Sequence, residues 1–280
     1  MQNEIVPCLW FNQEAQSAAT YYCSIFNDSE ILSENEMVVN FKINGKLFMG
    51  LNGGPAFTIN ESTSFFVYCG SDTEIERLHK ALSCDGSVLM PLGEYPWCKK
   101  FAWVKDKFGV SWQLDVDPIN SNQTIVPALL FTEEKFDKLK EASVFYQSVF
   151  PNSMSLLDMP YGKGAPEVPE DTVLFTQFKL NTNIFNLMSS NIKHEFDFNE
   201  GVSFVVYCET QNEIDTLWEQ FTTNGGQESQ CGWLKDKYGV SWQIVPTVLE
   251  QLLSDPERAP KIVEAFLKMT KFDIQTLLNS

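Results

Sequence analysis

The sequence predicts an α+β fold in which two tandem copies of a strand–helix–strand pattern are followed by a helical tail. Three observations support this prediction: several segments recur in the same order, apolar residues alternate between strand and helix spacing, and only helical signals follow Pro246. The chain has 280 residues, of which 44% are hydrophobic and 13% are aromatic. A chain of this kind can bury the cores of about two domains.

The duplication is visible in the letters of the sequence. The longest match pairs WVKDKFGVSWQL at 103–114 with WLKDKYGVSWQI at 233–244. Three shorter segments recur in the same order: 5–7 at 125–127, 41–44 at 178–181, and 64–69 at 203–208. The repeats predict a first domain at 1–118, a second domain at 124–246 and a helical tail at 247–280.

The first half of each copy is expected to place one amphipathic helix between strands. In the first copy, Ile5 to Phe11 is a short apolar run typical of a strand. A helix should follow, because apolar residues recur there at helical spacing: Ala15, Ala18, Ala19, Tyr22 and Phe26. Residues 37–43 and 46–51 are strand-like, and the Asn44-Gly45 pair between them predicts a hairpin turn.

The second half of the copy repeats this order. A strand is expected at 64–69, and strands at 101–105 and 111–115 should flank a turn at 106–109. Between them, residues 72–83 predict a helix capped by Asp72. Its apolar residues share one face: Ile75, Leu78, Ala81 and Leu82.

The tail is expected to contain three helices, at 247–253, 256–269 and 273–278, with Pro256 in the first turn of the second. Several apolar residues in this tail need a surface to cover: Ile262, Val263, Phe266, Leu267 and Met269. We expect them to pack on a domain or on a second chain.

Two insertions distinguish the copies. The second copy gains Met159 to Asp171, a stretch rich in glycine, proline and acidic residues that predicts a long loop able to act as a lid. The first copy alone has the aromatic loop Leu89 to Lys99. The two copies are therefore expected to have different roles.

The composition limits the partners. A formal net charge of −17 disfavours nucleic acid and anionic membrane surfaces. No apolar run approaches the roughly 20 residues that span a bilayer, and the first ten residues do not resemble a signal peptide. We expect a cytoplasmic protein whose seven cysteines are reduced and mostly buried.

The repeated pattern Trp-x-Lys-Asp-x-Phe/Tyr-Gly-Val-Ser-Trp-Gln resembles the PhnB-like family of the vicinal oxygen chelate superfamily, and so do residues 51–57, 90–97, 231–233 and 252–256. That superfamily includes glyoxalase I, extradiol dioxygenases and bleomycin- and fosfomycin-resistance proteins. PhnB-like members often carry the label 3-demethylubiquinone-9 3-methyltransferase-like. The resemblance implies two glyoxalase-like domains of paired βαβββ modules, each pair curving around a small-molecule cavity.

Metal-dependent members of the superfamily hold a divalent ion with His, Gln and Glu side chains on the cavity face. The resemblance places the corresponding positions near Val6, Met49, Ser64 and Gln113 in the first copy, and near Val126, Asn186, Ser203 and Gln243 in the second. Valine and methionine supply no oxygen or nitrogen ligand. We therefore expect no metal and no cofactor.

The two histidines are not expected to help, because His79 lies on a predicted helix and His194 in a polar loop, both solvated. A metal-dependent lyase, isomerase or dioxygenase remains the alternative. If the positions are displaced by a residue or two, then Glu4, Glu36 and Asp115 lie near enough to serve as ligands.

Methyltransferase activity is not expected. A nucleotide-like cofactor would need a glycine-rich turn between a strand and a helix, and neither Gly53-Gly54 nor 162–164 has that context. The catalytic residues are unknown. Glu94 in the proline-rich loop is the one weak candidate for a general acid or base.

A binding cavity remains as the main expectation. Ser111, Gln113 and Asp115 share one face of their strand, which should line the cavity, while Trp112 should pack under a helix. The residues expected to line a cavity are Trp10, Phe48, Tyr95, Trp97, Trp103, Gln113, Asn186, Trp233 and Gln243.

The leading hypothesis is a metal-free small-molecule-binding protein, monomeric or homodimeric, that sequesters an apolar or aromatic compound. A scaffold whose hollows are filled by its own side chains is the third hypothesis, beside the metal-dependent enzyme.

Overall fold

The computed structural model describes residues 4–117, 119, 121–165, 167–223 and 225–280. The chain divides into two compact units, Pro7–Val202 and Met1–Val6 with Ser203–Ser280. This division by contacts does not test the domain boundaries expected from the repeats, which stay a prediction, and residue 118, the expected end of the first domain, lies outside the described residues. Each unit is described by itself.

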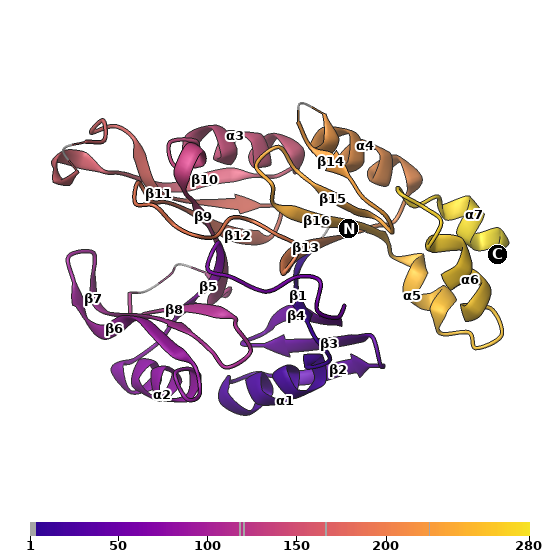
Figure 1. The fold of residues 1–280 in the computed structure, drawn as a ribbon, viewed down its shortest axis with the longest axis horizontal. Coiled ribbons are helices and arrows are strands. Elements are labelled where there is room, and N and C mark those ends of the chain that lie inside the picture. The colour runs from indigo at the N-terminus through magenta and orange to yellow at the C-terminus, as the bar shows by residue number, and fades with distance from the viewer. Residues whose placement is uncertain (1–3, 118, 120, 166, 224) are drawn as a thin grey trace. The chain divides into compact units, whose positions relative to one another are not determined.

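The larger unit contains most of the strands and three α-helices (Figure 1). Its strands in the first repeat are β1 (Ile5–Phe11), β2 (Glu30–Glu34), β3 (Val38–Ile43), β4 (Lys46–Asn52), β5 (Thr63–Tyr68), β6 (Ser87–Tyr95), β7 (Cys98–Lys105) and β8 (Ser111–Asp115). Those in the second repeat are β9 (Ile125–Phe131), β10 (Met154–Pro160), β11 (Val173–Leu180) and β12 (Asn183–Ser189). The helices are α1 (Ala15–Ile25), α2 (Asp72–Leu82) and α3 (Leu139–Val149), with short 3-10 turns at Glu133–Lys135 and Gly162–Gly164.

The first module follows the sequence prediction closely. Its strands pair in the order β1-β4-β3-β2, and α1 packs on β3 and β4. The turn between β3 and β4 uses Asn44 and Gly45, whose φ angles of 46° and 73° are those that a two-residue hairpin requires. Strand β2 was not predicted, because its residues are mostly exposed and lack an apolar alternation.

An eight-stranded sheet joins the two repeats. Its order is β10-β11-β12-β9-β5-β8-β7-β6, so that β5 of the first repeat pairs antiparallel with β9 of the second. In this pairing Ser64 lies opposite Ala128, and Phe66 lies opposite Val126. The second module of one repeat therefore forms a continuous sheet with the first module of the other, across the boundary that the repeats mark in the sequence.

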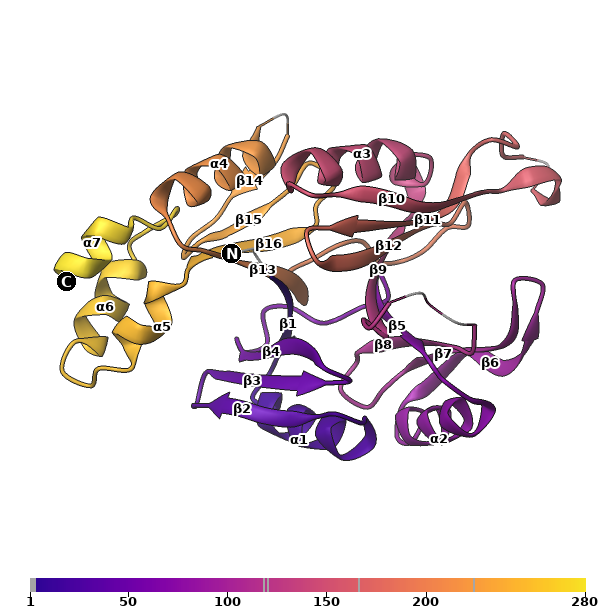
Figure 2. The same ribbon diagram turned by 180° about the vertical axis from the view of Figure 1, so that it is seen from behind.

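Helices cover the outer side of this sheet. Helix α2 packs on β7 and β8, and α3 packs on β11 and β12, as Figures 1 and 2 show for the two halves of the sheet. Trp112 on β8 is fully buried, and its ring centroid lies 5.4 Å from that of Tyr22 and 5.2 Å from that of Phe26. This agrees with the expectation that Trp112 packs under a helix.

Two local predictions are corrected by the structure. The N-cap of α2 is Ser71 rather than Asp72, because the Ser71 hydroxyl accepts a hydrogen bond of 3.2 Å from the Glu74 backbone amide. The aromatic stretch 89–99 is a twisted hairpin of β6 and β7 rather than a loop. Register shifts interrupt its pairing, which hid the strand period from the sequence.

The smaller unit contains a four-stranded part and the tail. Its strands are β13 (Val202–Cys208), β14 (Gln227–Glu228), β15 (Trp233–Lys235) and β16 (Ser241–Pro246), paired in the order β13-β16-β15-β14. Its helices are α4 (Gln211–Thr222), α5 (Val248–Leu253), α6 (Ala259–Phe266) and α7 (Ile274–Asn279). The second tail helix thus begins three residues later than expected, with Pro260 rather than Pro256 in its first turn.

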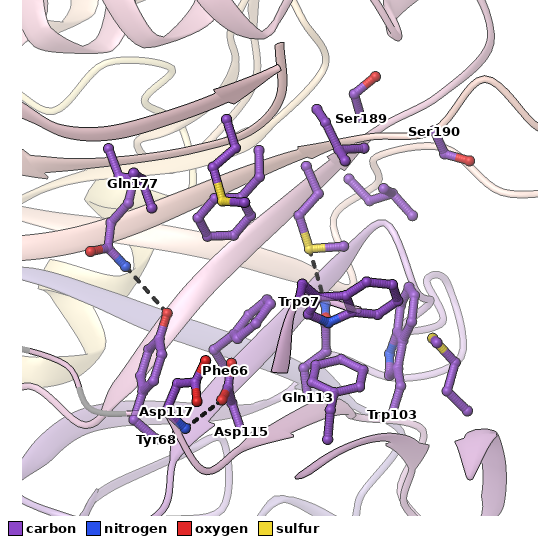
Figure 3. A pocket seen from close by; sticks show the side chains of 18 of the residues that line it. Phe66, Tyr68, Trp97, Trp103, Gln113, Asp115, Asp117, Gln177, Ser189 and Ser190 are labelled. Atoms are coloured by element: carbon purple, nitrogen blue, oxygen red, sulfur yellow. Dashed lines mark hydrogen bonds between the residues drawn. The ribbon is translucent and has the colours of Figure 1, made fainter. Parts of the chain in front are cut away.

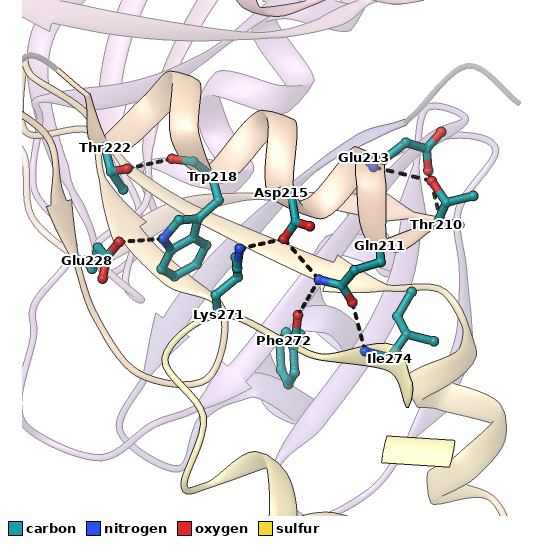
Figure 4. Close-up of polar contacts among 10 residues, drawn as sticks. All are labelled: Thr210, Gln211, Glu213, Asp215, Trp218, Thr222, Glu228, Lys271, Phe272 and Ile274. Atoms are coloured by element: carbon teal, nitrogen blue, oxygen red, sulfur yellow. Dashed lines mark hydrogen bonds and ion pairs between the residues drawn. The ribbon is translucent and has the colours of Figure 1, made fainter. Parts of the chain in front are cut away.

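The tail is held on α4 by polar contacts (Figure 4). Gln211 donates to the Phe272 carbonyl at 3.0 Å and accepts from the Ile274 amide at 2.9 Å, while Lys271 pairs with Asp215. Ile262 is fully buried within this unit, whereas Leu267 is exposed. Helix α6 packs on α5 and α7, so Ile262 is buried where the tail helices meet, and packing of the tail's apolar residues on a domain or on a second chain stays a prediction.

Replacing Gln211 with alanine is expected to lower the unfolding free energy of the smaller unit by about 1–2 kcal/mol, because two backbone groups of the tail lose their partner. Hydrogen exchange at the Ile274 amide should become faster. The control is Gln275→Ala, which removes only an exposed contact with Asn279. Equal exchange at Ile274 in both variants would contradict this account.

All seven cysteines lie among the described residues and are free thiols; four of them are buried, two are half-buried and Cys84 is exposed. Among the described residues, no helix is long and apolar enough to cross a membrane.

Candidate functional site: an aromatic cavity in the eight-stranded sheet

A cavity of about 620 Å³ lies in the larger unit, where the two halves of the eight-stranded sheet face each other (Figure 3). The half from the first repeat contributes mostly aromatic side chains: Phe66, Tyr68, Trp97, Phe101 and Trp103, with Met90. The half from the second repeat contributes Leu130, Leu157, Met159, Leu174, Phe175, Gln177, Met188 and Ser189. Because β5 and β9 pair, residues far apart in the sequence form one lining.

Strand alternation explains which residues reach the cavity from β8. Gln113 and Asp115 line it, as predicted from their shared face, while Trp112 between them is buried on the helix side. On the neighbouring strand β5, Phe66 and Tyr68 lie opposite Gln113 and Asp115 in the register and also line the cavity. The same register, had it been known, would have identified these two aromatic residues from the sequence.

The aromatic rings form a connected group. The ring centroid of Phe66 lies 5.9 Å from that of Tyr68, 6.3 Å from that of Phe101 and 6.0 Å from that of Phe175. Trp97 is half exposed and stacks on Tyr95 at 5.1 Å. Tyr95 itself does not line the cavity but supports Trp97, so its predicted role becomes indirect.

The resemblance places Gln113 near a position at which metal-dependent members of the superfamily hold their ion. Its side-chain nitrogen donates to the Ser64 hydroxyl at 2.8 Å and contacts the Met188 sulfur at 3.2 Å. A hydroxyl, a thioether and an amide do not make a donor set for a divalent ion such as zinc or magnesium. The residues around Gln113 therefore do not fit the metal of the metal-dependent relatives.

A different group of potential ligands lies at one end of the cavity. The ligand atoms of Cys98, Asp115 and Asp117 all lie within 4.8 Å of one another, the one such group of three among the described residues. The Cys98 thiol donates to Asp115 Oδ1 at 2.9 Å, and the Asp117 amide donates to the same oxygen at 2.7 Å. Sequence reasoning named only Asp115 of this group.

The surroundings of these three residues favour the protonated form of the Cys98 thiol. Burial raises the pKa of the Cys98 thiol, and its hydrogen bond to Asp115 raises it further. Burial also raises the pKa of Asp115, although the hydrogen bonds from Cys98 and Asp117 lower it. A thiol with a raised pKa is a poor thiolate ligand and a poor nucleophile.

Polar groups on the opposite wall are paired with one another. Asn186 is fully buried behind the lining, where its Oδ1 accepts from Gln177 at 2.9 Å and its amide nitrogen lies 3.4 Å from the Tyr68 hydroxyl. Gln177 donates to the same hydroxyl at 3.2 Å. Burial raises the pKa of Tyr68 to about 12, so the phenol is neutral at physiological pH.

The remaining predicted residues are placed elsewhere. Phe48 is buried in the core, and Trp10 donates its indole proton to the Gly54 carbonyl at 2.7 Å, away from the lining. Trp233 and Gln243 lie in the smaller unit, where Gln243 donates to Ser203 at 2.9 Å, as Gln113 does to Ser64. Glu94 is exposed on β6 and is not part of the lining.

His194 corrects a further expectation. It lines the cavity instead of being fully solvated, and its Nε2 lies 2.8 Å from the Ser190 hydroxyl. Its ring packs against Phe196 at 4.9 Å. In the stretch expected as a lid, Met159 and Pro160 form the end of β10, and Met159 contributes to the lining.

Paired βαβββ modules whose sheet curves around a cavity define the vicinal oxygen chelate fold. The glyoxalase I of Zea mays has this fold, and it matches the chain with a TM-score of 0.59 at 9% identity, over 91% of this chain and 97% of that one. The chain belongs to the 3-demethylubiquinone-9 3-methyltransferase family, whose model matches residues 3–115 and 123–245. The match of one family model to two regions confirms the family resemblance and the tandem duplication.

Two smaller bacterial proteins are similar to this chain. A protein from Bacillus cereus described as a putative 3-demethylubiquinone-9 3-methyltransferase, PhnB protein, is 37% identical over 39% of this chain and 96% of its own, with a TM-score of 0.38. A protein from Staphylococcus aureus is 34% identical over 42% of this chain and 99% of its own, with a TM-score of 0.20. No curated protein matches the chain significantly.

The family's name refers to methyl transfer, which this fold does not support. Gly53 and Gly54 follow β4 and precede an irregular segment rather than a helix. Residues 162–164 form a 3-10 turn. Neither position is the strand-to-helix turn at which methyl-donor nucleotides are usually bound.

Proposed function

We propose that the protein binds a small molecule in the aromatic cavity and sequesters it without a metal ion. The observation that carries the proposal is the composition of the lining, in which rings from both repeats surround a few convergent polar groups. The volume of about 620 Å³ is within the range of small-molecule sites. A scaffold filled by its own side chains would leave no space of this size.

Trp97 offers a direct test. Because its side chain is 51% exposed, replacing it with alanine should leave folding intact. Loss of this aromatic wall is expected to weaken binding of an aromatic ligand about tenfold, since aromatic contacts contribute roughly 0.5–1.5 kcal/mol beyond area burial. Leu32→Ala is a matched control, because Leu32 is 50% exposed and does not line the cavity.

The measurement is a thermal-shift screen with aromatic compounds, followed by calorimetric titration of the best one. At 100 times its Kd a ligand stabilises the protein by about 2.7 kcal/mol. Failure of every compound to shift the melting temperature, or equal affinity in the Trp97→Ala and wild-type proteins, would argue against this site.

The second candidate is a metal-dependent lyase, isomerase or dioxygenase of the same superfamily. The observation that favours it is the group of Cys98, Asp115 and Asp117 beside the cavity. The raised pKa of the thiol and the donor set around Gln113 favour the metal-free proposal instead. Purified protein dialysed against buffer is therefore expected to retain far less than one transition-metal ion per chain, and stoichiometric retention would reverse the preference.

A further inference from the structure

We propose that the cavity selects an organic cation, an amine or quaternary ammonium carried on an apolar or aromatic body. This inference rests on the proposed function, since it names the ligand class for the same cavity. Among the described residues, two carboxylates, Asp115 and Asp117, line the cavity, and no lysine or arginine does. In the described part of the lining His194 is the only basic side chain, and Tyr68 is a neutral phenol there.

The state of Asp115 is the first argument. Its side chain is only 8% exposed, yet neither it nor Asp117 forms an ion pair with a described basic residue. Both hydrogen bonds to Asp115, from Cys98 and from the Asp117 amide, use Oδ1. In the described structure Oδ2 therefore accepts no hydrogen bond. Asp115 lines the cavity, and Oδ2 is not among the buried side-chain oxygens without a partner, so this oxygen is open to a ligand. A mostly buried carboxylate that is open to a cavity favours a positive partner there.

The aromatic surroundings are the second argument. Phe66 and Tyr68 lie on β5 directly beside Gln113 and Asp115, and their rings stack at 5.9 Å (Figure 3). Aromatic faces attract a cation, and the attraction grows when the site excludes water. An ammonium group next to Asp115 would therefore gain both a counter-charge and ring contacts.

The third argument is that the cavity disfavours anionic ligands and bare metal ions. An anionic ligand would face two carboxylates in a chain whose formal net charge is −17. A bare metal ion would leave the aromatic volume unused, and it would compete with the thiol proton that already bonds Asp115 Oδ1. An organic cation would place its charge beside the two carboxylates and its apolar body against the aromatic side chains of the cavity.

Three matched probes test this by isothermal titration calorimetry: 2-naphthyltrimethylammonium, its neutral isostere 2-tert-butylnaphthalene, and 2-naphthalenesulfonate. We expect the cation to bind at least tenfold more tightly than the neutral isostere and the sulfonate to bind least. Asp115→Asn and Asp117→Asn should each weaken the cation about tenfold and leave the neutral isostere unchanged, which also shows that the variants fold.

Asp158→Asn is the control for the change in net charge, because Asp158 is exposed on β10 and does not line the cavity. Equal binding of the cation and the neutral isostere would overturn the selection for a cation while the proposed binding function stands. Binding of none of the probes would count against both. Stoichiometric binding of zinc alone, lost in Asp115→Asn, with no binding of the ammonium probe, would overturn the proposal in favour of a metal site.

Discussion

Replacing Asp106 with alanine is expected to lower the free energy of unfolding of the larger unit by about 3–5 kcal/mol. The Asp106 side chain is buried in the turn between β7 and β8. Its Oδ2 accepts from the Tyr22 hydroxyl and the Trp112 indole, each at 2.8 Å. Its Oδ1 accepts from the amides of Phe108 at 2.9 Å and Val110 at 3.0 Å.

The alanine variant would leave four donors, three of them in buried hydrogen bonds, without their acceptor, which is the physical reason for so large an effect. Asp106→Asn keeps the shape but turns an amide group toward the Trp112 indole proton, so we expect an intermediate loss. Urea unfolding followed by tryptophan fluorescence measures both. The control Asp137→Asn removes an exposed carboxylate with a surface ion pair and should change stability by less than about 0.5 kcal/mol. A similarly small change for Asp106→Ala would contradict the role of Asp106 as the acceptor that stabilises this turn.

The same turn in the second repeat repeats these contacts. Asp236 accepts from Trp242 at 2.9 Å and from the amides of Tyr238 and Val240 at 2.9 and 3.1 Å. The aspartate of the repeated segment therefore holds the same turn in both copies. This explains why the aspartate recurs although the loops around it differ between the copies.

Replacing Gly86 with alanine should cost about 2–3 kcal/mol, the second large effect, through overpacking. A Cβ atom at Gly86 would lie 2.3 Å from the Lys105 carbonyl oxygen and 3.0 Å from the Asp106 Cα, both in the backbone. Backbone atoms cannot rotate away as a side chain can, so the chain after α2 would have to shift. Chemical denaturation of the variant and of the wild-type protein measures the difference in their free energies of unfolding.

Gly93→Ala is the matched control, because a Cβ there meets nothing within 4 Å, and its stability should stay within about 0.5 kcal/mol of wild type. Gly226 in the smaller unit has the same close approach, with a Cβ only 2.0 Å from the Phe221 carbonyl oxygen. If Gly86→Ala and Gly93→Ala proved equally stable, the backbone contact would not limit this position.

Local sequence patterns determined the helices, strands and turns of this protein and which side chains share one face of a strand. The strand at 5–11, the helix after Ala15 and the Asn44-Gly45 turn depend on neighbours in the chain, and the structure has all three. The alternation along 111–115 correctly separated Trp112 from the cavity face, because side chains of a strand point to opposite sides whatever the strand pairs with.

The tertiary structure alone decided which walls form the cavity. Phe175, Gln177 and Met188 face Phe66 and Gln113 only because β5 pairs with β9, and no local signal in either strand specifies a partner so far along the chain. For the same reason Trp10 and Phe48, aromatic and well placed by strand order, lie outside the lining. Periodicity is fixed within a few residues, whereas a binding site depends on contacts between strands that are distant in sequence.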